Sequence, residues 1–183
     1  MIKELVVKRK DGELINVIIK KLDLSHINKI MELQENILAG IDNKETYAPS
    51  TIDEFKEVIL GKGEIIGCIT EKDKLIAMGV YVENKYDEHN YGYDLEIQGN
   101  DLLKVCQIES TIVDEDYRGN RLQKTICATI ESIAKERRMK LITATASPYN
   151  PFSVNTFIAL GYEIKKDKLK YGGLRRYVLA KNL

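Results

Sequence analysis

The stretch VDEDYRGNRLQ (residues 113–123) runs directly into KTICATIESIAKER (residues 124–137), and this junction decides the fold. The segment before it, LLKVCQIESTIV (residues 102–113), has the apolar, β-branched composition of a strand, and KLITATA (residues 140–146) reads as another strand. The apolar side chains of the intervening helix share one face: Leu122, Ile126, Ile130 and Ile133. A helix between two neighbouring strands carries the chain back to the end of the sheet where the first strand began. The sequence therefore predicts that the two strands are parallel.

The remaining segments predict further strands and helices on both sides of this unit. In order, we expect a hairpin around Asp11-Gly12 over 3–22, a helix over 25–40 capped by Asp23 or Ser25, a helix starting at the Thr51–Glu54 capping box, strands over 64–70 and 74–82, a short helix over 150–161 and closing strands over 162–166 and 174–180. The polar, tyrosine-rich residues 83–101 leave open a long functional loop or a pair of extended strand tips.

Composition limits the class of protein. A length of 183 residues with 44% apolar content and no Gly/Ser/Pro-rich linker predicts one domain over residues 1–183. The 28 basic and 28 acidic residues cancel, so we expect neither a nucleic-acid nor a membrane partner. The oligomeric state, a monomer or a homodimer, stays open. Cys68, Cys106 and Cys127 lie in apolar runs, which indicates reduced core thiols, no metal site and a cytoplasmic location. No apolar run approaches the roughly 20 residues of a membrane span, and the N-terminus lacks a signal-peptide pattern.

The glycine-containing turn before the helix has a physical use. Backbone N–H groups at a helix N-terminus point one way, and the helix dipole favours an anion such as a pyrophosphate there. Arg118 and Arg121 could add charge-assisted bonds to phosphate oxygens. Taken alone, the same residues also fit an ordinary polar loop.

At this point the chain resembles the GNAT superfamily of N-acetyltransferases, whose first signature reads V-x-P-x-Y-R-G-x-G-L-G. Val113, Tyr117, Arg118, Gly119 and Leu122 match it, whereas Glu115, Arg121 and Gln123 replace the proline and two glycines. The second signature, N-x-x-A-x-x-x-Y-x-x-x-G-F, is met in spacing by Asn150, Ser153, Phe157, Gly161 and Tyr162, with Ser for Ala and Phe for Tyr. The resemblance covers residues 17–179 and leaves residues 1–16 as an N-terminal strand or hairpin extension.

The resemblance implies a GNAT-like α/β fold, with a mixed, mainly antiparallel central sheet flanked by helices and an acetyl-CoA cleft between the strands around Ile112 and Ala144. It implies that the backbone of Ile112 and Val113 binds the pantetheine arm, and that Asn150, which also fits a helix N-cap before Pro151, contacts the cofactor. The N–H groups of seven consecutive residues would hold the pyrophosphate: Arg118, Gly119, Asn120, Arg121, Leu122, Gln123 and Lys124. Helical φ/ψ is open to Arg121 and Gln123, with the Arg121 side chain turned outward or onto a phosphate.

The implied chemistry is direct transfer of an acetyl group from acetyl-CoA to a primary amine of a small molecule or protein. Glu109 is the carboxylate on the expected cofactor-binding strand and the candidate base, although a solvent-facing glutamate fits the same position. Phe157 occupies the place of the family's usual acid, so Tyr149, Ser153 or Tyr162 would have to donate the proton, or the thiolate leaves unassisted. His26 and His89 are isolated and read as surface residues.

The acceptor and its charge stay open at this level. Asp87, Glu88 and Asp94, among the tyrosines of residues 86–96, suggest a cationic amine, whereas Arg175 and Arg176 suggest an acidic acceptor. The altered signatures also leave a second class of function, a catalytically silent CoA-binding domain.

Overall fold

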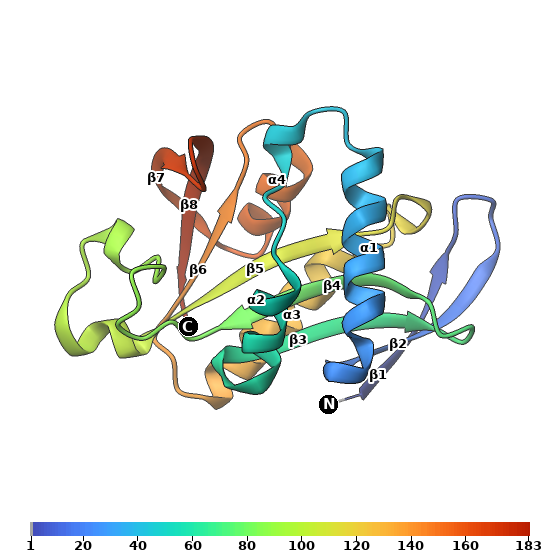
Figure 1. The fold of residues 1–183 in the computed structure, drawn as a ribbon, viewed down its shortest axis with the longest axis horizontal. Coiled ribbons are helices and arrows are strands. Elements are labelled where there is room, and N and C mark those ends of the chain that lie inside the picture. Colours follow the sequence, from blue (N-terminus) through green and yellow to red (C-terminus); the bar gives the residue numbers. More distant parts are fainter. Residues whose placement is uncertain (1) are drawn as a thin grey trace.

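The computed structural model describes residues 2–183, which form one mixed sheet with helices on both faces (Figure 1). In chain order the elements are β1 (Ile2–Lys8), β2 (Leu14–Leu22), α1 (Ile27–Gly40), α2 (Ile52–Glu57), β3 (Gly63–Thr70), β4 (Leu75–Val82), β5 (Val105–Val113), α3 (Leu122–Glu136), β6 (Leu141–Ala146), α4 (Pro151–Ala159), β7 (Glu163–Lys170) and β8 (Leu174–Asn182).

The strands form a single sheet in the order β1-β2-β3-β4-β5-β6-β8-β7. Strands β5 and β6 are parallel, and every other neighbouring pair is antiparallel. This arrangement confirms the predicted fold class and the parallel strand–helix–strand unit.

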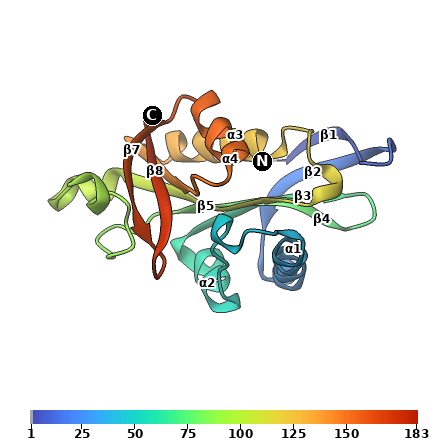
Figure 2. The same ribbon diagram turned by 90° about the horizontal axis from the view of Figure 1, so that it is seen from above.

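Two helices cover each face of the sheet. Figure 2 shows α1 and α2 on one side, and α3 and α4 on the other. Each layer has its own apolar core: Ile30, Leu33 and Phe55 pack on the α1/α2 side, whereas Ile126 and Ile130 of α3 pack on the opposite side. Cys68, Cys106 and Cys127 are buried and unpaired, as their apolar surroundings predict.

Local signals in the sequence place most element ends. The Asp23 side chain caps a 3-10 turn (Leu24–His26) that leads into α1. At the start of α2, the Glu54 N–H donates to Thr51 Oγ1 at 3.2 Å and the Thr51 N–H donates to Glu54 Oε2 at 2.6 Å, which is the predicted capping box. The tight turn between β1 and β2 places Gly12 at φ 94°.

One expected boundary is wrong, and one alternative that the sequence left open is resolved. Residues 102–104 were predicted as strand, but they close a 3-10 helix (Gly99–Lys104), and β5 begins at Val105. The ambiguous residues 83–101 are a loop with a further 3-10 turn (Tyr93–Leu95), not strand tips. The reason is that Asn90, 2% exposed, binds the loop to itself, because its Nδ2 donates to the Lys85 carbonyl oxygen at 2.6 Å.

A bulge in β5 separates it from β6. The pairing of β5 with β4 shifts register between Val80, opposite Glu109, and Met78, opposite Ile112, and Ser110 adopts φ 46° in the extra length. Parallel pairing with β6 ends at Ile108, although β5 continues to Val113 (Figure 1). Because a bulge bends its strand, it opens the sheet on the side of β6.

Candidate active site

The gap between β5 and β6 opens into a cavity of about 1540 Å³. One end is lined by the turn before α3 and by the start of α4. The other end is lined by the α1–α2 connection, the loop after β4 and the β7–β8 turn. The second half of β5, which contains Glu109, Ile112 and Val113, runs along the cavity between these two ends.

The turn before α3 leaves the N-terminus of that helix open. No side chain of the described residues 2–183 caps α3, so its first N–H groups keep their hydrogen-bonding capacity for a ligand. Gly119 has φ 85° with no atom within 4 Å of a Cβ built there, and Arg118, Gly119 and Arg121 line the cavity. An uncapped helix end beside two exposed guanidinium groups fits a pyrophosphate.

Gln123 has the expected helical backbone conformation, but the same expectation is wrong for Arg121. Arg121 stands at the α3 N-cap with φ 57° and ψ 26°, in the left-handed region that a signature glycine would occupy without strain. The chain therefore keeps the turn geometry of the resemblance and places a larger residue in it. The Arg121 side chain is exposed.

Gln123 reaches across the cavity wall. Its Nε2 donates to Thr111 Oγ1 of β5 at 3.2 Å and to Ser153 Oγ of α4 at 3.0 Å. One side chain therefore connects the three elements that flank the cofactor end of the cavity. Thr111, Gln123 and Ser153 all line this cavity.

The other cofactor-side residues divide into two groups. Leu122 and Asn150 line the cavity, and Asn150 Oδ1 accepts from the Ser153 N–H at 3.2 Å, which confirms the predicted cap of α4. Asn120 and Lys124 lie outside the residues that line it. The Asn120 side chain accepts from the Lys8 N–H at 2.8 Å and donates to the Lys8 carbonyl oxygen at 2.7 Å, so it ties the turn to the N-terminal hairpin.

Glu109 lies at the opposite end, half-buried on β5. Burial raises the pKa of its carboxyl group above the ordinary value, and a hydrogen bond from Gln107 opposes part of that rise. Gln107 also accepts from the Tyr91 N–H at 3.1 Å and donates to the His89 carbonyl oxygen at 3.2 Å. Gln107 and Glu109 are two residues apart on β5, so their side chains lie on the same face of the strand. Gln107 therefore holds both Glu109 and the loop after β4 in place.

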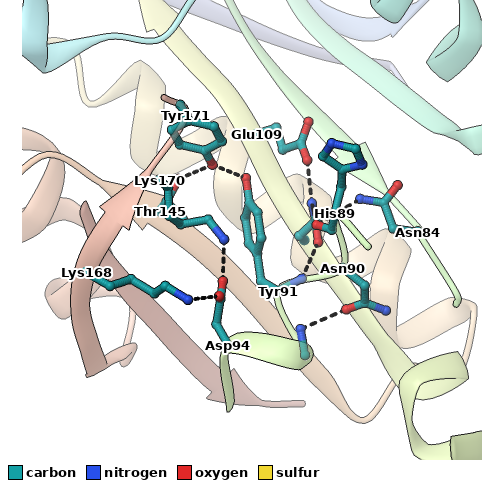
Figure 3. A network of polar contacts seen from close by, with 12 residues as sticks. Asn84, His89, Asn90, Tyr91, Asp94, Glu109, Thr145, Lys168, Lys170 and Tyr171 are labelled. Atoms are coloured by element: carbon teal, nitrogen blue, oxygen red, sulfur yellow. Dashed lines mark hydrogen bonds and ion pairs between the residues drawn. The ribbon is translucent and has the colours of Figure 1, made fainter. Parts of the chain in front are cut away.

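A group of hydroxyls lies beside Glu109 (Figure 3). The Tyr171 hydroxyl, at the β7–β8 turn, is hydrogen-bonded to the Tyr91 hydroxyl and to Thr145 Oγ1 of β6, the latter at 2.9 Å. Burial raises the pKa of both tyrosines. Asp94 pairs with Lys168 Nζ at 2.6 Å and with Lys170, whose Nζ lies 4.6 Å from the centre of the Tyr91 ring.

The candidate acids differ in their access to the cavity. Tyr149, 48% exposed, and Ser153 both line it. Tyr162 is buried away from it, and its hydroxyl has no hydrogen-bond partner within residues 2–183. Phe157 is 1% exposed, packs edge-on against Tyr162 with ring centres 5.1 Å apart, and is also absent from the cavity lining.

The expectation of two surface histidines is wrong for His26, whose side chain is 11% exposed and is paired through Nδ1 with Asp23 at 2.8 Å before α1. His89 is exposed at the rim of the cavity and is paired through Nδ1 with Asp87 at 2.7 Å. Glu88 also lines the rim, whereas Tyr86 and Tyr93 are exposed outside it. Three further cavity or network residues carry no motif in the sequence: Gln107, Thr145 and Tyr171. The one available signal was the position of Gln107 two residues before Glu109 on the same strand.

Within residues 2–183, no group of three or more His, Cys, Asp or Glu side chains is arranged to hold a metal ion. No helix in the same range is long and apolar enough to cross a membrane.

Comparison with known proteins gives a family and a fold. The family model described as the acetyltransferase (GNAT) family matches residues 28–162, which is more than half of the chain. No curated protein sequence matches the chain.

Solved structures of similar fold include several acetyltransferases. An N-acetyltransferase from Staphylococcus aureus Mu50 has a TM-score of 0.69 at 15% identity, over 91% of this chain and 98% of that one. The acetyltransferase of the GNAT family from Streptococcus pneumoniae has a TM-score of 0.69 at 10% identity, over 91% and 99% of the two chains. The ribosomal-protein-S18-alanine N-acetyltransferase from Escherichia coli has a TM-score of 0.66 at 11% identity, over 91% and 93%.

Proposed function

The chain belongs to the acetyltransferase (GNAT) family, and from this premise we propose that it transfers the acetyl group of acetyl-CoA to a primary amine of a small molecule or protein by direct attack. The observation that carries the proposal is a single cavity with an uncapped helix N-terminus at one end and a half-buried glutamate, Glu109, at the other. The first feature suits an anionic cofactor, and the second suits a base.

The residues at the α3 end fit acetyl-CoA. The N–H groups between Gly119 and Gln123, with the Arg118 and Arg121 guanidinium groups, would hold the pyrophosphate. Beyond Ile108, β5 has no pairing with β6, so the backbone of Ile112 and Val113 on that side can bind the pantetheine arm. Bound acetyl-CoA would supply a thioester as the acyl donor.

Glu109 prepares the acceptor in this proposal. An alkylammonium group must lose a proton before its nitrogen can attack a carbonyl carbon, and Glu109 accepts that proton. The raised pKa of Glu109 brings its basicity closer to that of the amine, which favours the transfer. A free N–H of β5 would polarise the carbonyl oxygen, and Tyr149 or Ser153 would protonate the departing thiolate.

The experiment is a calorimetric titration with acetyl-CoA, followed by a screen of amines for CoA thiol release. We expect micromolar binding that is weakened by Arg118→Ala and by Gly119→Pro, because proline cannot adopt the φ of 85° found at residue 119. Lys135→Ala, at an exposed position on α3 outside the cavity, is the matched control and should bind like the native protein. Absence of binding by the native protein would refute the proposal.

The second candidate function is a CoA-binding domain without turnover. The observation in its favour is Phe157, an apolar and buried side chain at the place of the signature tyrosine. Tight acetyl-CoA binding combined with no thiol release for any amine in the screen would select this alternative.

A further inference from the structure

Arg176 of β8 is a buried cation at the acceptor end of the cavity. The residue is 3% exposed and is among the residues that line the cavity. Its Nη1 donates to the Glu45 carbonyl oxygen at 2.7 Å and to the Arg175 carbonyl oxygen at 2.8 Å. Its Nη2 is buried and has no hydrogen-bond partner within residues 2–183. Burial lowers the pKa of Arg176, but a guanidinium group stays charged in proteins.

The neighbouring cations are already neutralised by the protein. Lys168 and Lys170 share Asp94, and Lys62 pairs with Glu57 at 2.8 Å. Arg175 binds both oxygens of Asp167 and lies outside the cavity lining. Arg176 differs because, within residues 2–183, its side-chain hydrogen bonds go to two carbonyl oxygens and it pairs with no carboxylate. Burying a charge without a counter-ion is unfavourable, so Arg176 is a site that an anion would stabilise.

Arg176 is connected to Glu109 through Tyr171 and Tyr91, which Figure 3 shows near Glu109. The Arg176 guanidinium carbon lies 5.8 Å from the centre of the Tyr171 ring. The Tyr171 hydroxyl is bonded to that of Tyr91, whose backbone is held by the same Gln107 side chain that donates to Glu109. Arg176 and Glu109 therefore line the same cavity and are linked through the contacts of the two tyrosines.

We propose that the acceptor is an amine that also carries a carboxylate, of the amino-acid class, with the amine at Glu109 and the carboxylate on Arg176. This inference rests on the proposed function and assigns its substrate class. Nη2 is shielded from solvent, so the carboxylate must displace a neighbouring side chain, and we assign this movement to Tyr171, whose ring centre lies 5.8 Å from the guanidinium carbon. Tyr171 is suited to such a movement, because it is 43% exposed and stands with Gly172 and Gly173 in a turn where all three residues have positive φ.

The same contacts argue against a preference for cationic acceptors. Asp94 is held by two lysines and Asp87 by His89, so two of the three loop carboxylates already have positively charged or polar partners. The negative charges of Asp94 and Asp87 are therefore largely compensated within the protein. The unpaired guanidinium group of Arg176 then decides the sign of the acceptor's charge.

The test compares matched acceptors in a thiol-release assay with saturating acetyl-CoA. Each free amino acid of a panel, with its reacting amine at the α-carbon or on the side chain, is paired with its own α-carboxamide, which keeps the amine and side chain and removes the negative charge. We expect kcat/KM at least about 10-fold higher for the free acid of the preferred pair, as for a charge-assisted hydrogen bond. Arg176→Lys should reduce this preference about 10-fold through KM while leaving the Kd for acetyl-CoA unchanged, because lysine cannot reproduce the planar fork.

Arg175→Lys is the matched control, since it changes the adjacent arginine on the same strand outside the cavity, and it should keep the native preference. Equal or better use of the carboxamides by the native protein would overturn the inference, even if Arg176→Lys failed to fold. An unchanged preference in a folded Arg176→Lys variant would overturn it as well. Acetyl-CoA binding without turnover of any acceptor would instead overturn the proposed function, and this inference with it.

Discussion

Removal of the Gln123 side chain is expected to strengthen acetyl-CoA binding. In the free protein Gln123 Nε2 donates to Thr111 Oγ1 of β5 at 3.2 Å and to Ser153 Oγ of α4 at 3.0 Å. These two elements flank the gap along which the pantetheine arm is proposed to lie. If the pantetheine arm lies in this gap, both hydrogen bonds of Gln123 must break before acetyl-CoA can bind. Breaking them costs free energy, and Gln123→Ala removes that cost.

The magnitude follows from the two bonds. A neutral hydrogen bond within a protein contributes about 0.5–1.5 kcal/mol net, so full release of both costs about 1–3 kcal/mol. The freed amide can bond to water or to a phosphate, which returns part of this amount. We therefore expect the lower part of the range, about 1–1.4 kcal/mol, which corresponds to a Kd for acetyl-CoA about 5–10-fold lower in Gln123→Ala.

Isothermal titration calorimetry of the native protein, Gln123→Ala and Lys124→Ala measures this effect directly. Lys124 is the next residue of α3, is exposed and lies outside the cavity lining, so its substitution should leave the Kd unchanged. A Kd for Gln123→Ala about 10-fold higher than native would show that Gln123 is a ligand of the cofactor. An unchanged Kd would show that the bridge does not stand in its path. Either result would refute the reasoning.

Three further predictions follow from single residues. Glu109→Gln should lower kcat about 10²–10⁴-fold, and it should remove the acidic limb of the native pH–rate profile, which lies above pH 4.5 because burial raises the Glu109 pKa. Arg121→Gly should raise the free energy of unfolding in urea by about 1 kcal/mol, since glycine relieves the left-handed strain; a fall would contradict this. Asn120→Ala should lower the free energy of unfolding by about 1–3 kcal/mol, because both hydrogen bonds to Lys8 are lost. An unchanged urea midpoint would show that these bonds do not stabilise the fold.

The elements that the sequence specifies correctly are those set by neighbours along the chain. The helical spacing from Leu122 to Ile133 and the β-branched runs on both sides were sufficient for the parallel unit around α3, because each element must bury one face. Caps follow the same logic. The Thr51–Glu54 box and the Asn150 cap need only residues three positions apart.

The features that the sequence could not specify depend on contacts across the fold. The bulge at Ser110 exists because β5 must pair with β4 while it leaves β6, and neither partner is local. The left-handed conformation of Arg121 is imposed by the turn, against the preference of the residue. Tyr91 and Tyr171 are separated by 80 positions, so their hydroxyl pair has no pattern that a reading of neighbours would detect.

The replacement of the signature tyrosine by Phe157 bears less on activity than the state of Glu109 does. A thiol with a pKa of about 8.5 is a fair leaving group near neutral pH, so transfer can proceed without a dedicated acid. Hydroxyls of Tyr149, Ser153 and Tyr171 also line the cavity and can supply a proton. Deprotonation of the amine is the more demanding step, because a protonated amine cannot attack and a neutral hydroxyl is a poor proton acceptor. We therefore expect Glu109 to distinguish an enzyme from a silent CoA-binding domain, because burial has raised its carboxyl pKa in the direction that a base requires.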